Sequence, residues 1–158
     1  NRIGEIVEEC EFYKEDFKII EWDSANIYED NHQEYYDYDI GLIHDALVMG
    51  VRDYFNKVGF KNAVLGSSGG IDSAVVHALA AEALGAENVK AITMPSKYSS
   101  TGSVDDAKKL AKNLGSPFSN ISIKDVFDSF NETLAEEFTG TEPNVTEENL
   151  QARARGIM

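Results

Sequence analysis

The spacing of apolar residues changes several times along the chain. Over residues 40–58 apolar side chains recur every three or four positions, which predicts an amphipathic helix that Gly59 would end. The short apolar run 63–65 predicts a buried strand, and the alanine-rich stretch 72–84 predicts a second helix. Another strand is predicted over residues 89–93. A strand, a glycine-rich turn and a helix therefore follow one another without a spacer.

The alternation continues in the C-terminal half. A helix is predicted from Ser103, with Asp106 in a variant of the capping box, and a third strand over residues 118–123. A further helix ends at Gly140, and a last helix begins with Thr146 as its N-cap. Alternating strands and helices predict a parallel sheet flanked by helices, with right-handed crossovers. Three strands are fewer than the ~5–6 usual in a sheet, so we expect further strands C-terminal to this chain.

The first 40 residues differ in kind from the rest. Aromatic and β-branched residues over positions 12–22 predict one or two strands. Residues 23–39 mix acidic residues, Asn and Tyr without any period, which predicts an extended linker. Residues 1–40 hold 13 acidic and 3 basic side chains, whereas residues 41–158 hold 15 and 11. We therefore expect the tail of a larger unit before the regular helical pattern begins.

Composition narrows the classes of function. The chain has 158 residues, 42% of them apolar, and no apolar run near the ~20 residues that cross a bilayer, so we expect no membrane span. Its net charge of −14 disfavours general binding to nucleic acid. A lone Cys10 cannot form an internal disulfide, and the chain does not start with the basic and apolar segments of a signal peptide. A cytoplasmic protein is therefore expected.

The candidate chemistry lies in the turn after the first predicted strand, where residues 68–73 read SGGIDS. In a parallel sheet such a turn presents backbone N–H groups that attract phosphate oxygens. Asp72 would repel a bare phosphate, so we interpret it as a magnesium ligand. No lysine follows the glycines, so the Walker-A pattern is not met, and G-x-G-x-x-G is also absent. The alternative is a plain turn, with Ser68 and Asp72 as helix caps.

The string SGGIDS resembles the PP-loop of the N-type ATP pyrophosphatases. Three further stretches resemble the NAD synthetases within that family: DYFNKVGF at 53–60, MPSKYSS at 94–100 and NLQARAR at 149–155. Together these stretches cover most of residues 40–158.

The resemblance also implies a division into domains. Residues 1–22 are similar to the final strands of the nitrilase-like amidase that precedes the synthetase domain in glutamine-dependent members. The expected domains are therefore an amidase tail with an acidic linker over residues 1–39, and an ATP-pyrophosphatase domain over residues 40–158, incomplete at its C-terminus. The fold implied is α/β, a Rossmann-like parallel sheet of the adenine nucleotide alpha hydrolase type with helices on both faces.

In the chemistry that the resemblance implies, the nicotinate carboxylate of deamido-NAD attacks the α-phosphate of ATP, which gives an adenylated intermediate and pyrophosphate. Ammonia, free or derived from glutamine, then displaces AMP. Such chemistry needs charge stabilisation on the phosphates more than a proton-transfer residue, so no catalytic side chain is assigned. The implied cofactors are ATP and Mg²⁺, and the implied partners are the amidase domain of the same polypeptide and further copies in a homo-oligomer.

The same resemblance assigns roles by position. Asp72 would bind Mg²⁺, Met94 would contact adenine through its backbone, and Arg153 would bind deamido-NAD. The ATP phosphates would be held by Gly66, Ser67, Ser68, Gly69, Gly70, Ile71, Asp72 and Ser73. Ser67 stands where the family more often has an apolar residue. The family's threonine for ATP, second acidic metal ligand and phosphate-binding lysines are expected beyond Met158, so the chain alone is expected to be inactive.

Two alternatives stay open. Another PP-loop amidating ligase, such as GMP synthetase, would form a different adenylated substrate, although the MPS loop and the arginine string favour nicotinate. A nucleotide-binding fragment would hold ATP on the PP-loop without turnover.

Overall fold

The computed structural model describes residues 6, 8–20, 40–96, 99–142 and 144–158. The chain divides into two compact units, residues 1–50 and 51–158, which are described separately. The predicted linker over residues 23–39 lies outside the described residues. None of the helices formed by the described residues combines the length and the apolar character needed to span a bilayer.

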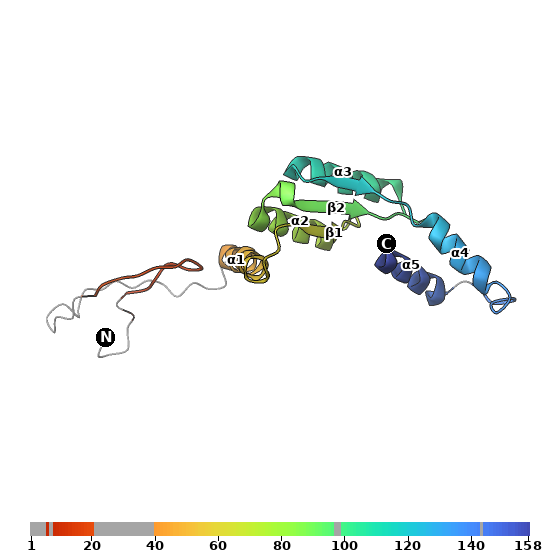
Figure 1. The fold of residues 1–158 in the computed structure, drawn as a ribbon, viewed down its shortest axis with the longest axis horizontal. Coiled ribbons are helices and arrows are strands. Elements are labelled where there is room, and N and C mark those ends of the chain that lie inside the picture. Colours follow the sequence, from red (N-terminus) through yellow and green to blue (C-terminus); the bar gives the residue numbers. More distant parts are fainter. Residues whose placement is uncertain (1–5, 7, 21–39, 97–98, 143) are drawn as a thin grey trace. The chain divides into compact units, whose positions relative to one another are not determined.

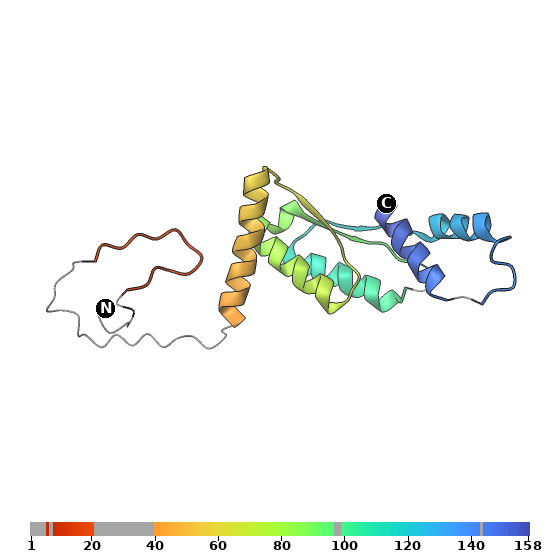
Figure 2. The same ribbon diagram turned by 90° about the horizontal axis from the view of Figure 1, so that it is seen from below.

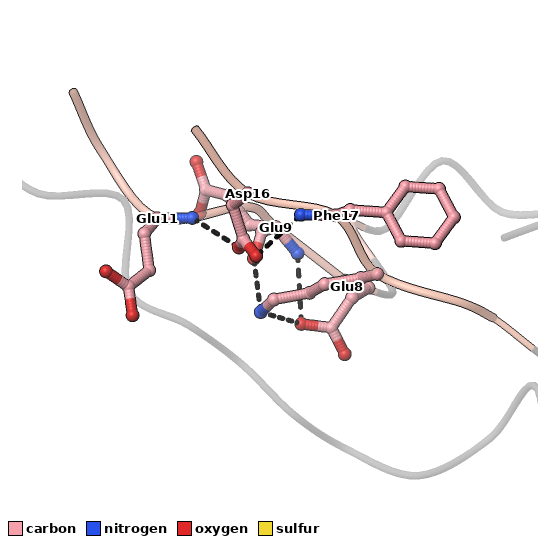
Figure 3. A network of polar contacts seen from close by, with 6 residues as sticks. Glu8, Glu9, Glu11, Asp16 and Phe17 are labelled. Carbon is pink, nitrogen blue, oxygen red and sulfur yellow. Dashed lines mark hydrogen bonds and ion pairs between the residues drawn. The ribbon is translucent and has the colours of Figure 1, made fainter. Parts of the chain in front are cut away.

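In the N-terminal unit, residues 8–20 form a loop with a turn at residues 12–14. Figure 3 shows the polar contacts within this loop. The Lys18 ammonium donates to the Glu8 carboxylate and to the Glu9 carbonyl, each at 2.7 Å. Asp16 accepts from the backbone N–H groups of Glu11 and Phe17. The prediction of strands is wrong for the described residues 12–20, where side chains rather than a neighbouring strand take these backbone bonds.

Helix α1 spans Ile40–Val58. The chain leaves it through Gly59, whose φ of 76° suits a glycine, so the predicted helix and its end are confirmed. In the part of α1 that belongs to the second unit, the Nε of Arg52 donates to the carbonyl of Ala83 at 3.3 Å. This bond joins the end of α1 to the end of the helix that follows the first strand.

Three parallel strands form the sheet, in the order β1-β2-β3: β1 Ala63–Gly66, β2 Val89–Thr93 and β3 Phe118–Asn120. Leu65 lies opposite Ala91, and Ala91 lies opposite Phe118 in the register. Val89 and Ala91 are fully buried because β2 is the central strand. The predicted parallel α/β architecture is confirmed.

Two helices complete the crossovers, α2 over Ile71–Leu84 and α3 over Thr101–Leu114. A short 3-10 turn, η1 (Ala86–Asn88), leads from α2 into β2. Because both crossovers run in the same direction along the sheet and share one hand, α2 and α3 lie side by side on one face (Figure 2). On α3 the small residues Ala107 and Ala111 are buried, which allows close packing.

After β3 the chain forms α4 (Lys124–Leu134) and then α5 (Val145–Ile157), which packs on α4 (Figure 1). The fourth helix is shorter than predicted, since its regular part ends at Leu134 and single turns continue to Gly140. The third strand is shorter too. Beyond Asn120 the N–H groups of Ile121 and Ile123 bond to carbonyls of residues 93 and 95, outside the ladder.

The predicted N-caps of α3 and α5 are wrong. Helix α3 starts before Ser103, because the Ser100 hydroxyl accepts from the Ser103 N–H at 3.1 Å and so acts as the cap. Helix α5 is capped by Asn144 rather than Thr146, and the Glu147 carboxylate accepts from the Asn144 N–H at 2.6 Å. The Asn144 side chain accepts in return from the backbone of Glu147, so the two residues form a complete capping box.

Candidate functional site

The glycine turn leaves the carboxyl end of β1 and enters α2 directly. The N–H of Ser67 still bonds to the carbonyl of Ile92 at 2.8 Å, so the turn begins where the ladder between β1 and β2 ends. A cavity of about 530 Å³ opens at this edge of the sheet. Gly66, Ser67 and Ser68 line it from the turn. The edge formed by the carboxyl ends of the strands is where parallel α/β sheets bind ligands.

Two serines hold the turn in shape. The Ser68 hydroxyl accepts from the Gly70 N–H at 3.2 Å and contacts the Ser73 hydroxyl at 3.1 Å. The Ser73 hydroxyl donates to the Gly70 carbonyl at 3.0 Å and accepts from the Ser68 N–H at 3.2 Å. Both hydroxyls are therefore already used within the turn, and they fix its backbone rather than standing ready for a ligand.

The N-terminus of α2 has no side-chain cap. Gly70 occupies the N-cap position with φ −86° and ψ 163°, and no side chain there accepts from the first-turn N–H groups. The alternative interpretation, with Ser68 and Asp72 as helix caps, therefore does not match the structure. The N–H groups in the first turn of this 14-residue helix therefore have no side-chain acceptor. Together with the partial positive charge of the helix N-terminus, they favour the binding of an anion.

Gly69 has no room for a side chain. Its φ is 84°, and a Cβ built there would lie 2.7 Å from the Cα of Ser103 on α3. At Gly70 the nearest heavy atom to a built Cβ is the Ser68 hydroxyl oxygen, at 3.4 Å. The two glycines thus differ: Gly69 is required by the packing of the turn on α3, whereas Gly70 leaves open space at the start of α2.

Ile71 and Asp72 follow the turn and are exposed. Among the described residues no group of three His, Cys, Asp or Glu side chains is placed to hold a metal ion. A single exposed carboxylate beside an uncapped helix N-terminus still fits Mg²⁺, because that ion usually takes one or two carboxylates together with phosphate oxygens and water. Asp72 is the residue that would supply the carboxylate.

The carboxyl end of β2 forms a second side of the cavity, through Thr93, Met94 and Pro95. Arg155 reaches the same cavity from α5. Its Nε donates to the Met94 carbonyl at 3.3 Å. The structure thus brings the start of the glycine turn, Met94 and Arg155 together around one cavity. Residues 69–73 of the predicted site are not among the residues that line it.

Arg153 is placed differently from Arg155. It is exposed and is not among the residues that line the cavity. Residues two apart on a helix point about 200° away from each other, so only one arginine of the string faces the sheet. The sequence shows two arginines in one short string. It does not show how α5 is rotated, and this rotation decides that Arg155 rather than Arg153 faces the cavity. Ser103, which also lines the cavity, was missed because it was expected to start a helix.

Ser67 is a residue of the site with an unusual environment. It is 2% exposed, and its hydroxyl oxygen has no hydrogen-bond partner. A buried hydroxyl without a partner costs about 1–3 kcal/mol of stability. Ser67, which stands where the family more often has an apolar residue, therefore also lowers the stability of the turn.

Comparison with known proteins agrees with this geometry. A family model described as NAD synthase matches residues 43–158. The chain is 57% identical over 111 residues to the glutamine-dependent NAD(+) synthetase of Thermotoga maritima, covering 70% of this chain and 19% of that protein. It is 41% identical over 158 residues to the enzyme of that name from Synechocystis sp., covering 99% of this chain and 28% of the relative.

A solved structure is also similar. The glutamine-dependent NAD+ synthetase of Acinetobacter baumannii, in complex with adenosine diphosphate, superposes with a TM-score of 0.71 at 47% identity. The match covers 73% of this chain and 22% of that one. The chain thus spans between about a fifth and somewhat over a quarter of the length of these relatives.

Proposed function

Because this chain belongs to the NAD synthase family, we propose that it supplies the ATP-binding part of an enzyme that amidates deamido-NAD to NAD. ATP would be cleaved to AMP and pyrophosphate through an adenylated intermediate, and the nitrogen would come from glutamine through ammonia. The enzyme would be a ligase that forms a carbon–nitrogen bond. We place it in the cytoplasm as a homo-oligomer, with the ammonia supplied by an amidase domain to which residues 1–39 would belong.

One observation carries the proposal: the uncapped N-terminus of α2 beside the cavity. The glycine turn is pinned on one side by its contact with Ser103 and internally by Ser68 and Ser73, so its backbone, and with it the first turn of α2, is fixed before a ligand arrives. Donors that are already in position stabilise phosphate charge in the transition state without a reorganisation cost. We assign the phosphates of ATP to Gly66 and the seven residues that follow it.

The remaining roles are those that the resemblance to the family assigns. Met94, at the end of β2, would contact adenine through its backbone, and Arg153 would bind deamido-NAD from the exposed side of α5. Asp72 would hold Mg²⁺, which neutralises phosphate charge when it is bound. The residues themselves bind and orient ATP, and none of them is assigned a proton transfer.

The first test is turnover by the full gene product. With ATP, Mg²⁺, deamido-NAD and either glutamine or ammonium chloride, we expect NAD and pyrophosphate in equal amounts. Xanthosine monophosphate in place of deamido-NAD tests the GMP synthetase alternative, and formation of GMP but not NAD would contradict the proposal. Binding of ATP without pyrophosphate release would support the alternative of a nucleotide-binding protein without turnover.

The second test concerns the metal. Asp72→Asn keeps the size of the side chain and removes its charge, so we expect the rate to fall by on the order of 10²-fold or more and the melting temperature to change little. Asp125→Asn is the matched control, because Asp125 is an exposed carboxylate in the first turn of α4. Retained activity in Asp72→Asn, or an equal loss of rate in both variants, would contradict a role of Asp72 in holding Mg²⁺.

A further inference from the structure

Arg155 is the one charged side chain among the described residues that line the cavity. The other lining residues are glycine, serine, threonine, proline or apolar residues, and none is acidic. The chain has a net charge of −14, yet the charge among these lining residues is positive. We expect an anion to lie beside Arg155, because a cation at the wall of a cavity is only partly hydrated.

The protein orients this guanidinium without neutralising it. Its Nε donates to the Met94 carbonyl at 3.3 Å, and its Nη2 donates to the Gln151 Oε1 at 3.4 Å. Gln151 is buried, and its Oε1 also accepts from the Ser96 hydroxyl at 2.8 Å. The acceptors are neutral and belong to the end of β2 and to α5 itself, so they fix where the guanidinium points while leaving its charge in place.

Donors remain for a ligand. A guanidinium has five N–H groups in a planar fork, and only two of them are used by these bonds. In the part of the chain that the structure describes, Arg155 forms no ion pair with a carboxylate. The fork geometry matches phosphate oxygens better than an ammonium does. Gly66, Ser67 and Ser68, at the end of β1 and the start of the turn, line the same cavity.

The geometry points to Arg155 as a direct ligand of a nucleotide phosphate in this cavity. Its free N–H groups would donate to the phosphate oxygens of a nucleotide held beside Gly66, Ser67 and Ser68. This inference rests on the proposed function only in taking a nucleotide as the ligand. Both ATP and a dinucleotide carry the phosphate chemistry that Arg155 fits, so the experiment must separate them.

Arg155→Gln in the full gene product tests the assignment, with calorimetric titrations of ADP, adenosine, deamido-NAD and NAD. Loss of a charge-assisted bond to phosphate should weaken ADP binding about tenfold or more, while adenosine binding stays within about twofold. Arg155→Lys keeps the charge but not the fork, and we expect an intermediate loss. A tenfold loss for deamido-NAD and equally for NAD, which lacks the nicotinate carboxylate, with ADP unchanged would also support a phosphate ligand, with the dinucleotide as its source. A loss for deamido-NAD alone would overturn it.

The control is Arg52→Gln. The Nε of Arg52 also donates to a backbone carbonyl at 3.3 Å, but Arg52 does not line the cavity, so its loss should leave all four affinities unchanged. Equal weakening of ADP and adenosine in Arg155→Gln would overturn the inference, since the side chain would then act only by shaping Met94. Unchanged binding of ADP and deamido-NAD in Arg155→Gln and Arg155→Lys would also overturn it. A parent protein that binds ADP but makes no NAD would contradict the proposed function and leave the Arg155 result standing.

Discussion

Gly69 is held by two independent features, its left-handed backbone and the contact of the turn with the backbone of Ser103. Gly69→Ala should lower the free energy of unfolding by about 2–5 kcal/mol. A positive φ costs an L-residue about 1–2 kcal/mol, and overpacking adds about 1–3 kcal/mol. Urea unfolding followed by circular dichroism measures the loss.

Gly70→Ala provides the comparison within the same turn. With φ −86° and the nearest heavy atom 3.4 Å from the built Cβ, a methyl group fits, and the loss should stay below about 1 kcal/mol. Equal destabilisation by both variants would mean that the contact with Ser103 does not set the shape of the turn.

His77, on α2, is fully buried, and neither ring nitrogen has a hydrogen-bond partner. Burial lowers the pKa of its imidazole below the ordinary value of 6.5, because the charged form loses its hydration. Above pH 6.5 the ring is neutral in both the folded and the unfolded chain, so its titration does not change the free energy of unfolding. Below pH 6.5 the unfolded chain binds the proton first, so stability falls as the pH falls toward the folded-state pKa.

His77→Leu should therefore flatten the pH dependence of unfolding. A single histidine contributes at most about 1.4 kcal/mol per pH unit, and this slope should disappear between pH 6.5 and 5.5 in the variant. Urea midpoints at pH 5.5, 6.5 and 7.5 give the measurement. If His77→Leu keeps the parent's slope, another group is responsible.

At the scale of elements, short apolar runs separated by glycines predicted the existence and order of β1, α2 and β2. The caps were harder to predict. Ser99, Ser100 and Ser103 all suit the start of α3, and only the bond from the Ser103 N–H to the Ser100 hydroxyl selects one of them. The choice between Arg153 and Arg155 has the same origin, since it depends on how α5 is rotated against the end of β2.

The cap assignment is testable on α3. Ser100→Ala removes the hydroxyl that accepts from the first turn, and we expect a loss of about 1 kcal/mol in the free energy of unfolding. Asp106→Ala removes only an exposed pair with Lys109 at 3.8 Å, so the change should stay within about 0.5 kcal/mol. Chemical denaturation of both variants distinguishes the two positions, and a larger effect of Asp106→Ala would restore the cap predicted from the sequence.

At the scale of the whole molecule, the two faces of the sheet differ. Along β2 the buried residues Val89 and Ala91 alternate with the exposed Lys90, and α2 and α3 cover the buried side. On the other side Val64 of β1 lies beside Lys90 in the register and is 66% exposed. The sequence marks Val64 as a residue to be covered, since parallel sheets are usually buried on both faces. It does not say which element or molecule covers it.

An open, partly apolar sheet face with β1 at its edge predicts self-association of the 158-residue chain. Val64→Lys should lower it by placing a charge on this face and a second cation beside Lys90, which resists stacking. Val145→Lys is the matched control, because Val145 is 65% exposed on α5 and its replacement changes the net charge equally. Any general effect of charge on association is therefore shared by both variants. Sedimentation equilibrium should show a shift toward monomer for Val64→Lys alone. A parent chain that is already monomeric, or an equal shift in both variants, would mean that this face does not drive association.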